Sequence, residues 1–356
     1  MPAHDAYDPA EMARRLEAWL APKLDATDVA ISDLRAPGET GMSSETIMFD
    51  ATWSTSGATG SAALVLRSRP TGHVVFPIYD LGMQYDVIGK VAAAAPTVPT
   101  PPLRWFEPST KPIGREFFVM DLVNGDVPPD NLPYTMGGWL LDATPRQQRN
   151  LQMSSVDVLA DIHAIDWRAA GLEVLDQPAY GSLGLDQQLG FYEFFLDWGR
   201  MGRPQPTLDR VAAWLRSNRP DPEPDLVFNW GDARIGNILF RDHAPVAVLD
   251  WEMATIGPRE VDLAWFCLLE RFFSSHLGVP NLPGFGSTHD VVAHYEQRTK
   301  YKVTDFDWYT VWASFRYAVV MMRIVQAAEL AGDDIGFTEH DNVAVTLLET
   351  LESEVC

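Results

Sequence analysis

The hydrophobic pattern changes its period partway along the chain, and this change limits the folds that the sequence can adopt. Before residue 120, much of the chain alternates apolar and polar residues, as at Ile47, Phe49, Ala51 and Trp53, which is typical of half-buried strands. After residue 120, apolar residues recur almost everywhere at helical spacing. We therefore expect an antiparallel sheet followed by a mainly helical region. Further strands are predicted from residue 29 onward and over 62–67, 103–106 and 117–120, and helices behind Asp8 and over 78–94.

The polar, proline-bearing segment DLVNGDVPPDNLPY separates these two regions. We place the boundary between two lobes there, with residues 1–121 forming an N-terminal lobe and residues 122–356 a C-terminal lobe. A chain of 356 residues also exceeds the usual size of a single domain. The expected fold class is therefore α+β, with a small antiparallel-sheet lobe and a larger, mostly helical lobe. In the second lobe, helices are predicted at about 146–165, 187–200, 206–218, 260–274, 288–300, 305–331 and 338–353.

Charge and composition exclude several classes of protein. The chain has 49 Asp and Glu against 27 Lys and Arg, and a formal net charge of −22 repels nucleic acid and anionic membrane surfaces. No stretch reaches the ~18 apolar residues needed to span a bilayer, and the first residues lack the layout of a secretory signal. Only Cys267 and Cys356 are present, which argues against a disulfide framework or a cysteine-rich metal site. We expect a cytoplasmic protein without nucleic acid or membrane partners, and the sequence leaves the oligomeric state open.

The stretch NWGDARIGNILF, residues 229–240, packs an acid, an arginine and an asparagine into one short loop. Two short strands are predicted after the loop, over Ile238–Phe240 and Val246–Leu249, with a turn between them. Pairing these strands brings the residues before the first strand close to the residues after the second. The hairpin therefore predicts that polar groups from its two ends share one small volume.

Four polar side chains flank this hairpin. Asp232 and Asn237 precede the first strand, and Asp250 and Glu252 follow the second. Crowded carboxylates repel one another and resist burial unless a cation neutralises them. Mg²⁺ prefers oxygen ligands and is usually held by one or two carboxylates together with substrate phosphates, which fits Asn237 and Asp250. The alternative is that these acids only cap turns and helices.

The stretches WGDARIGNILF, DWEMATIG and DLAW together resemble the signature of the aminoglycoside phosphotransferase family, which includes choline-kinase-like relatives and has the protein-kinase-like fold. The resemblance implies that Asp232 accepts the proton of the substrate hydroxyl, and that Asn237 and Asp250 hold Mg²⁺. Phosphoryl transfer depends on positioning more than on a strong base, so an ordinary carboxylate pKa of about 4 suffices. Arg234 is a candidate catalytic residue that either contacts phosphate or pairs with an acid. Asp262 is expected to brace the loop by accepting backbone N–H bonds.

The resemblance also implies a nucleotide site, with ATP as cofactor, in the N-terminal lobe. The stretch APGETGMSSETIMF lies where kinase-like folds cover the phosphates, and Ser43 and Ser44 can donate to phosphate oxygens. Arg67 matches the basic residue that grips phosphate, and backbone groups near Asp121 and Val123 would meet adenine. A glycine-rich hairpin turn without a ligand is the alternative for the first stretch.

Three residues depart from the usual family pattern. Trp230 stands where most relatives have histidine, and a tryptophan could brace the loop by packing. Arg67 replaces the usual lysine, and Gln84 falls where its glutamate partner is expected, so the ion pair would become a neutral hydrogen bond. Glu45 or Asp86 is the alternative partner for Arg67.

Together these features predict an ATP- and Mg²⁺-dependent phosphotransferase that transfers the γ-phosphate to a hydroxyl of a small molecule. The alternative is a catalytically impaired, nucleotide-binding module of the pseudokinase kind, because three positions depart from the family pattern together. A protein kinase ranks third, since no recognisable activation segment separates Asp250 from Asp262. The sequence does not identify the phosphate acceptor.

Overall fold

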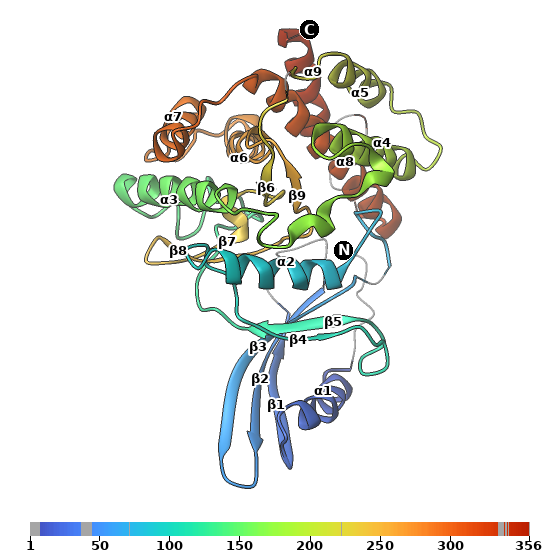
Figure 1. The fold of residues 1–356 in the computed structure, drawn as a ribbon, viewed down its shortest axis with the longest axis vertical. Coiled ribbons are helices and arrows are strands. Elements are labelled where there is room, and N and C mark those ends of the chain that lie inside the picture. Colours follow the sequence, from blue (N-terminus) through green and yellow to red (C-terminus); the bar gives the residue numbers. More distant parts are fainter. Residues whose placement is uncertain are drawn as a thin grey trace.

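The chain folds into two lobes stacked along the long axis of the molecule (Figure 1). The computed structural model describes residues 8–36, 45–70, 72–221, 223–333, 338, 340 and 342–355. One lobe contains a five-stranded sheet, and the other is mostly helical. This arrangement confirms the predicted α+β, bilobal fold class.

The small lobe is built on an antiparallel sheet with the strand order β1-β2-β3-β5-β4. The strands are β1 (Asp28–Arg35), β2 (Glu45–Ser54), β3 (Thr59–Ser68), β4 (Leu103–Glu107) and β5 (Phe117–Asp121). β2 and β3 pair without a register shift, from Glu45 opposite Ser68 to Ser54 opposite Thr59. On its other side β3 pairs with β5, with Arg67 opposite Phe118. The C-terminal end of β3 is its end nearest the large lobe (Figure 1).

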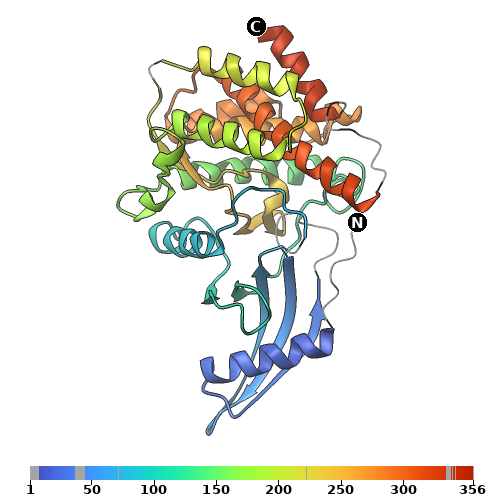
Figure 2. The ribbon, with the colours of Figure 1, turned by 90° about the vertical axis from the view of Figure 1, so that its right-hand side faces the viewer.

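The two faces of the sheet are covered by different helices. α1 (Pro9–Lys23) begins at the N-cap Asp8 with a proline in its first turn, as predicted, and packs an apolar stripe against one face (Figure 2). α2 (Leu81–Ala94) packs Val87 and Val91 into the core on the other face, together with Phe118 of β5. Because α2 shares its core with the helical lobe, this face of the sheet is tied to the large lobe.

The large lobe is organised around one long helix, α8, whose buried positions include Trp308, Trp312 and Met322. An apolar surface on most sides of a helix favours a central position, and α8 contacts α4, α5, α6 and α9. The helices of the described residues here are α3 (Pro145–His163), α4 (Leu185–Gly199), α5 (Pro206–Ser217), α6 (Glu260–Phe272), α7 (Thr288–Thr299), α8 (Phe306–Ala331) and α9 (Val343–Val355). The predicted helices agree within a few residues, with the largest difference at α9, which was expected to begin at residue 338.

Two small antiparallel ladders position the loop between the lobes. β7 (Ile238–Arg241) and β8 (Ala244–Val248) form the predicted hairpin, with a register shift near Phe240. β6 (Val227–Asn229) pairs with β9 (Thr255–Gly257), a ladder that the sequence analysis did not predict. The second ladder clamps the two ends of the segment that carries the polar residues.

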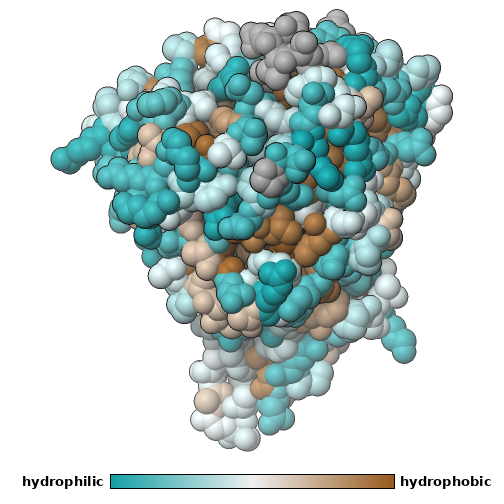
Figure 3. Space-filling model, turned by 45° about the horizontal axis from the view of Figure 1, so that its top comes forward, coloured by the Kyte–Doolittle hydropathy of each residue, from teal (hydrophilic) through white to brown (hydrophobic). Residues whose placement is uncertain are grey.

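One face of the molecule shows how polar and apolar residues are distributed on the surface. The face in Figure 3 is mostly hydrophilic, with one group of hydrophobic residues gathered near its middle. Among the described residues, none of the helices combines the length and apolar character needed to cross a membrane.

Candidate active site

The loop that precedes β7 is closed by hydrogen bonds between Asp232 and Asn237. The loop runs into a 3₁₀ turn, Ile235–Asn237, before β7 begins. The Nδ2 atom of Asn237 donates to Oδ2 of Asp232 at 2.6 Å and to the backbone carbonyl of Asp232 at 3.1 Å. The amide therefore uses its N–H groups on Asp232, which leaves its Oδ1 atom as an oxygen ligand.

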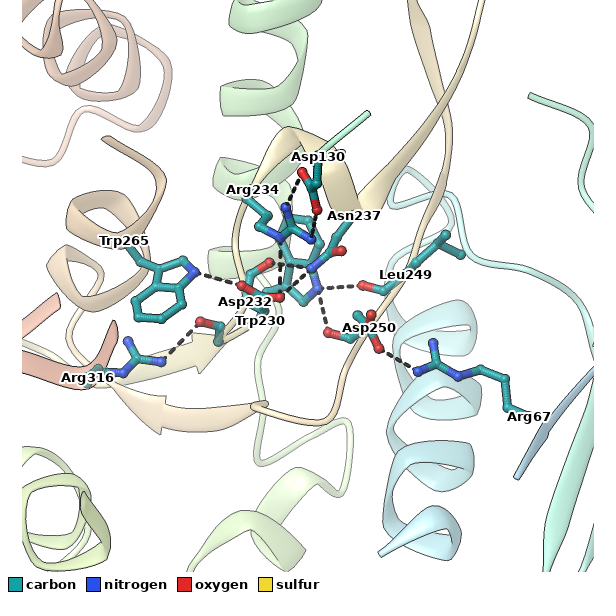
Figure 4. A network of polar contacts seen from close by, with 11 residues as sticks. Arg67, Asp130, Trp230, Asp232, Arg234, Asn237, Leu249, Asp250, Trp265 and Arg316 are labelled. Carbon is teal, nitrogen blue, oxygen red and sulfur yellow. Dashed lines mark hydrogen bonds and ion pairs between the residues drawn. The ribbon is translucent and has the colours of Figure 1, made fainter. Parts of the chain in front are cut away.

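Asp250 reaches the same network from the far end of the hairpin (Figure 4). The backbone N–H of Leu249 donates to the carbonyl of Asn237 at 2.8 Å, which fixes the two ends of the hairpin side by side. Asp250 then adopts a left-handed conformation with φ +56°. Its Oδ1 atom accepts a 2.6 Å ion pair from Nη2 of Arg67 on β3, so this contact joins the two lobes.

Arg234 forms a two-pronged ion pair with an acid that the sequence analysis did not identify. Its Nη1 and Nη2 atoms each lie 2.8 Å from an oxygen of Asp130, which comes from the segment between β5 and α3. Its Nε atom lies 3.5 Å from Oδ2 of Asp232. A Cβ atom added at Gly236 would lie 2.6 Å from Nη1 of Arg234, so glycine leaves room for the ion pair. Of the two alternatives for Arg234, this geometry is that of a salt bridge.

Burial changes the acidity of the candidate base. Removal from water raises the pKa of Asp232, while the positive charge of Arg234 acts in the opposite direction. Hydrogen bonds from Trp265 and Asn237 also lower the pKa, but burial has the largest effect. The carboxyl group is therefore less acidic than the ordinary aspartate that the sequence analysis considered sufficient.

A buried acid braces the backbone that leads into the loop. Asp262, at the start of α6, accepts from the backbone N–H groups of Trp230 at 2.7 Å and Gly231 at 2.9 Å, which confirms the expected brace. His163 contacts the same carboxylate through Nε2 at 3.2 Å, and its Nδ1 atom lies 2.7 Å from the hydroxyl of Tyr295. These buried contacts make His163 a structural residue.

Trp230 supports the hairpin with its side chain. The indole N–H donates to the carbonyl of Leu249 at 2.8 Å and lies 3.2 Å from that of Asp250. The ring is almost fully buried and lies beside the ring of Trp251, with 6.0 Å between the ring centres. The tryptophan therefore braces the approach to Asp250 by both packing and hydrogen bonding, as expected for its position.

Trp265 also contacts the candidate base, and the sequence analysis missed this residue. Its indole N–H donates to Oδ1 of Asp232 at 2.8 Å, so each carboxylate oxygen of Asp232 accepts from a different side chain (Figure 4). Trp265 belongs to the DLAW stretch of the signature, which was its only signal. Asp130 had no signal beyond its place in the polar segment PPDN.

Only some residues of the predicted nucleotide site lie within the described part of the chain. Ser43 and Ser44 lie outside the described residues, so their predicted contacts with phosphate stay predictions. β5 ends at Asp121, whose carboxylate pairs with Arg104 at 2.6 Å. The next backbone N–H, of residue 122, still donates to the sheet, and Val123 follows beyond the strand.

The predicted hydrogen bond between Arg67 and Gln84 was wrong. Arg67 pairs with Asp250, and Gln84 is buried on α2 without forming the expected hydrogen bond to it. Of the two alternative partners, Glu45 forms an ion pair with Arg115, and Asp86 forms one with Lys90 at 2.6 Å. Gln84 is a neutral amide, and the carboxylate of the ion pair with Arg67 comes from the other lobe.

The two lobes, with an acid-bearing loop and the hairpin between them, define a protein-kinase-like fold. The sequence profile of the APH phosphotransferase enzyme family matches residues 51–295, and the chain belongs to this family.

Solved structures share the fold. One from Ralstonia eutropha, provisionally described as an aminoglycoside phosphotransferase, is 22% identical with a TM-score of 0.67, over 96% of this chain and 98% of that one. An aminoglycoside phosphotransferase solved with GDP and kanamycin is 13% identical with a TM-score of 0.58, over 95% of this chain and 98% of that one.

Curated relatives are longer proteins. Acyl-CoA dehydrogenase family member 11 of Rattus norvegicus is 28% identical over 217 residues, which cover 59% of this chain and 25% of the relative. The Gallus gallus protein of the same name is 30% identical over 210 residues, or 58% of this chain and 25% of the relative. The chain thus matches about a quarter of the length of these relatives.

Proposed function

We propose that the protein is a Mg²⁺- and ATP-dependent phosphotransferase that transfers the γ-phosphate to a hydroxyl group of a small molecule. One observation carries this proposal. The carboxylate of Asp232 is fixed by hydrogen bonds to both of its oxygens, from Asn237 and Trp265, beside a second carboxylate, Asp250, which a cation from the other lobe contacts. Family membership supports the same reaction class.

The donor set suits Mg²⁺. Asn237 offers its amide oxygen and Asp250 a carboxylate, and Mg²⁺ is usually bound through one or two such groups together with substrate phosphates. Among the described residues no group of three or more His, Cys, Asp or Glu side chains could hold a metal. When bound, Mg²⁺ would neutralise charge on the phosphate oxygens. Asn237 and Asp250 would hold it.

The chain's own residues would do the rest. Asp232 would orient the acceptor hydroxyl and take its proton. The hydroxyl oxygen attacks the γ-phosphorus, and the bond between this phosphorus and the leaving ADP breaks. Arg67 would contact the phosphates, together with Ser43 and Ser44, because its guanidinium lies near the end of β3 and faces Asp250. Backbone groups near Val123 would bind the adenine ring.

The test is phosphotransfer by the purified protein with ATP or GTP, Mg²⁺ and a panel of hydroxylated acceptors. The panel should include an aminoglycoside, an amino alcohol and a hydroxyacyl-CoA, since the curated relatives are named as acyl-CoA dehydrogenases. Asp232→Asn should lower kcat by about 10³-fold or more. Asp242→Asn, the same change in the exposed turn of the β7–β8 hairpin, is the matched control and should leave kcat unchanged. Equal activity of the two variants would refute the role of Asp232.

The second candidate is a nucleotide-binding module without transfer activity. The pairing of Arg67 with Asp250, and the absence of an acid at Gln84, favour it, because the usual ion pair behind the phosphates is missing. A thermal shift with ATP, combined with the product assay, separates the two functions. A binding module would be stabilised by nucleotide yet form no product with any acceptor.

A further inference from the structure

One charged side chain of α8 points into the protein interior toward the catalytic loop (Figure 4). Arg316 is 2% exposed, and its Nη2 atom donates to the backbone carbonyl of Gly231 at 3.1 Å. Its Nε and Nη1 atoms are buried and donate to no acceptor among the described residues, so no carboxylate there neutralises the charge of Arg316. Burying a guanidinium without a carboxylate is costly, so an apolar residue would serve stability better at this position.

Aromatic rings receive the buried charge. The guanidinium carbon of Arg316 lies 4.6 Å from the ring centre of Trp265, 5.3 Å from that of Tyr192 and 6.0 Å from that of Trp312. Cation–π contacts at such distances offset part of the loss of hydration. The shortest of the three distances is to Trp265, the residue whose indole N–H donates to Asp232.

Arg316 therefore touches two supports of the candidate base. One is the carbonyl of Gly231, the residue directly before Asp232, and the other is the ring of Trp265. Gly231 has φ +93° and lies so close to the backbone of Met253 that no side chain fits there. A change at Arg316 would reach Asp232 through both supports.

We propose that Arg316 is a positioning residue, which holds the Trp265 ring and the Gly231 carbonyl so that the carboxylate of Asp232 faces the acceptor hydroxyl. The inference rests on the proposed phosphotransfer and adds a group that does not touch substrate. Displacement of a reacting group by about 1 Å costs about 10²-fold in rate. The effect should fall on kcat, because both supports act on Asp232, the proposed base.

Arg316→Met removes the charge and the donor while keeping the length of the side chain. We expect kcat to fall about 10- to 100-fold, with the KM for nucleotide within about threefold of wild type. Trp265→Phe keeps a ring and removes the donor to Asp232, and should lower kcat similarly. In the double variant the losses should not multiply, because both changes act through the same contact. Arg316→Lys, which keeps a donor and a charge, should recover part of the loss.

Arg323→Met is the matched control. Arg323 lies seven residues further along α8, is also buried, stacks 4.3 Å from the ring centre of Trp198 and donates to the carbonyl of Val74 at 2.8 Å. It shares the chemistry of Arg316 and contacts neither Gly231 nor Trp265. Thermal unfolding checks that both variants are folded. If kcat of Arg316→Met then equals that of Arg323→Met, the positioning role is refuted.

A spectroscopic readout separates this inference from the proposed function. In protein labelled with ¹⁵N-tryptophan, the indole signal of Trp265 is assigned by its loss in Trp265→Phe. Arg316→Met should shift this signal and Arg323→Met should not, and an unshifted signal in Arg316→Met would overturn the inference even without any activity. Wild-type protein that phosphorylates no acceptor would instead overturn the proposed function.

Discussion

Replacing Asp130 with asparagine removes one negative charge and keeps the shape of the side chain. In the native protein both Asp130 oxygens lie 2.8 Å from Arg234, whose side chain is 20% exposed while that of Asp130 is 32% exposed. Breaking a fully buried ion pair costs about 3–5 kcal/mol, whereas exposed pairs contribute about 0–1 kcal/mol. Partial exposure places this pair between the two, so the free energy of unfolding should fall by about 1–2 kcal/mol.

The same change should slow catalysis through Arg234. With Asp130 neutral, the remaining ion pair of the guanidinium is the one with Asp232, already 3.5 Å from its Nε atom. A closer ion pair would hold the candidate base away from the acceptor hydroxyl. We expect kcat to fall about tenfold and the KM for nucleotide to stay within about twofold.

Urea unfolding and steady-state phosphotransfer measure the two effects. Glu193→Gln is the control, because it breaks another two-pronged ion pair, with Arg216 at 2.7 and 2.9 Å, on the surface between α4 and α5. The control should lose up to about 1 kcal/mol and keep its kcat. If Asp130→Asn behaves like Glu193→Gln in both assays, the link between Asp130 and Asp232 is wrong.

Three further predictions concern the surroundings of the loop. Trp230→Phe removes the donor to the carbonyl of Leu249, next to a predicted metal ligand, and should weaken nucleotide–Mg²⁺ binding about fivefold by calorimetry. Burial raises the pKa of Glu270 to about 8, so the folded protein keeps a proton that the unfolded chain loses near pH 4.5. The contribution of Glu270 to the free energy of unfolding is therefore fully present below pH 4.5 and is lost as pH rises through 8. Glu270→Gln does not titrate, so its free energy of unfolding should rise relative to wild type between those two pH values, as measured by urea unfolding at each pH. In Gly231→Ala the added Cβ would lie 1.9 Å from the carbonyl oxygen of Met253 at φ +93°, and thermal unfolding should show a loss of about 3 kcal/mol or more.

The elements with a clear period could be predicted from the sequence. The strands of the sheet alternate their apolar residues, the α8 segment is apolar over a length that favours a helix, and α1 adds a capping aspartate and a proline. The β6–β9 ladder could not be predicted in this way, because each strand has only three residues and its partner lies beyond the hairpin. A ladder that short carries no readable alternation.

The site was predictable where its residues are close in sequence. Asp232 and Asn237 are five residues apart, so their hydrogen bond follows from the turn between them. Asp130 lies 104 residues from Arg234, and no local rule connects an acid in a polar segment to that arginine. Arg67 was assigned by position on its strand, yet its partner depended on which side chain of the other lobe lay within reach.

The contact between Arg67 and Asp250 bears on how the two lobes can move apart. Hinge bending that separates the lobes must pull a guanidinium from a carboxylate at 2.6 Å, where the side chains are only 11% and 19% exposed. Dissolved ions screen such a sheltered pair weakly. The motion of one lobe relative to the other should therefore depend little on ionic strength, in contrast to motions that are resisted only by surface charges.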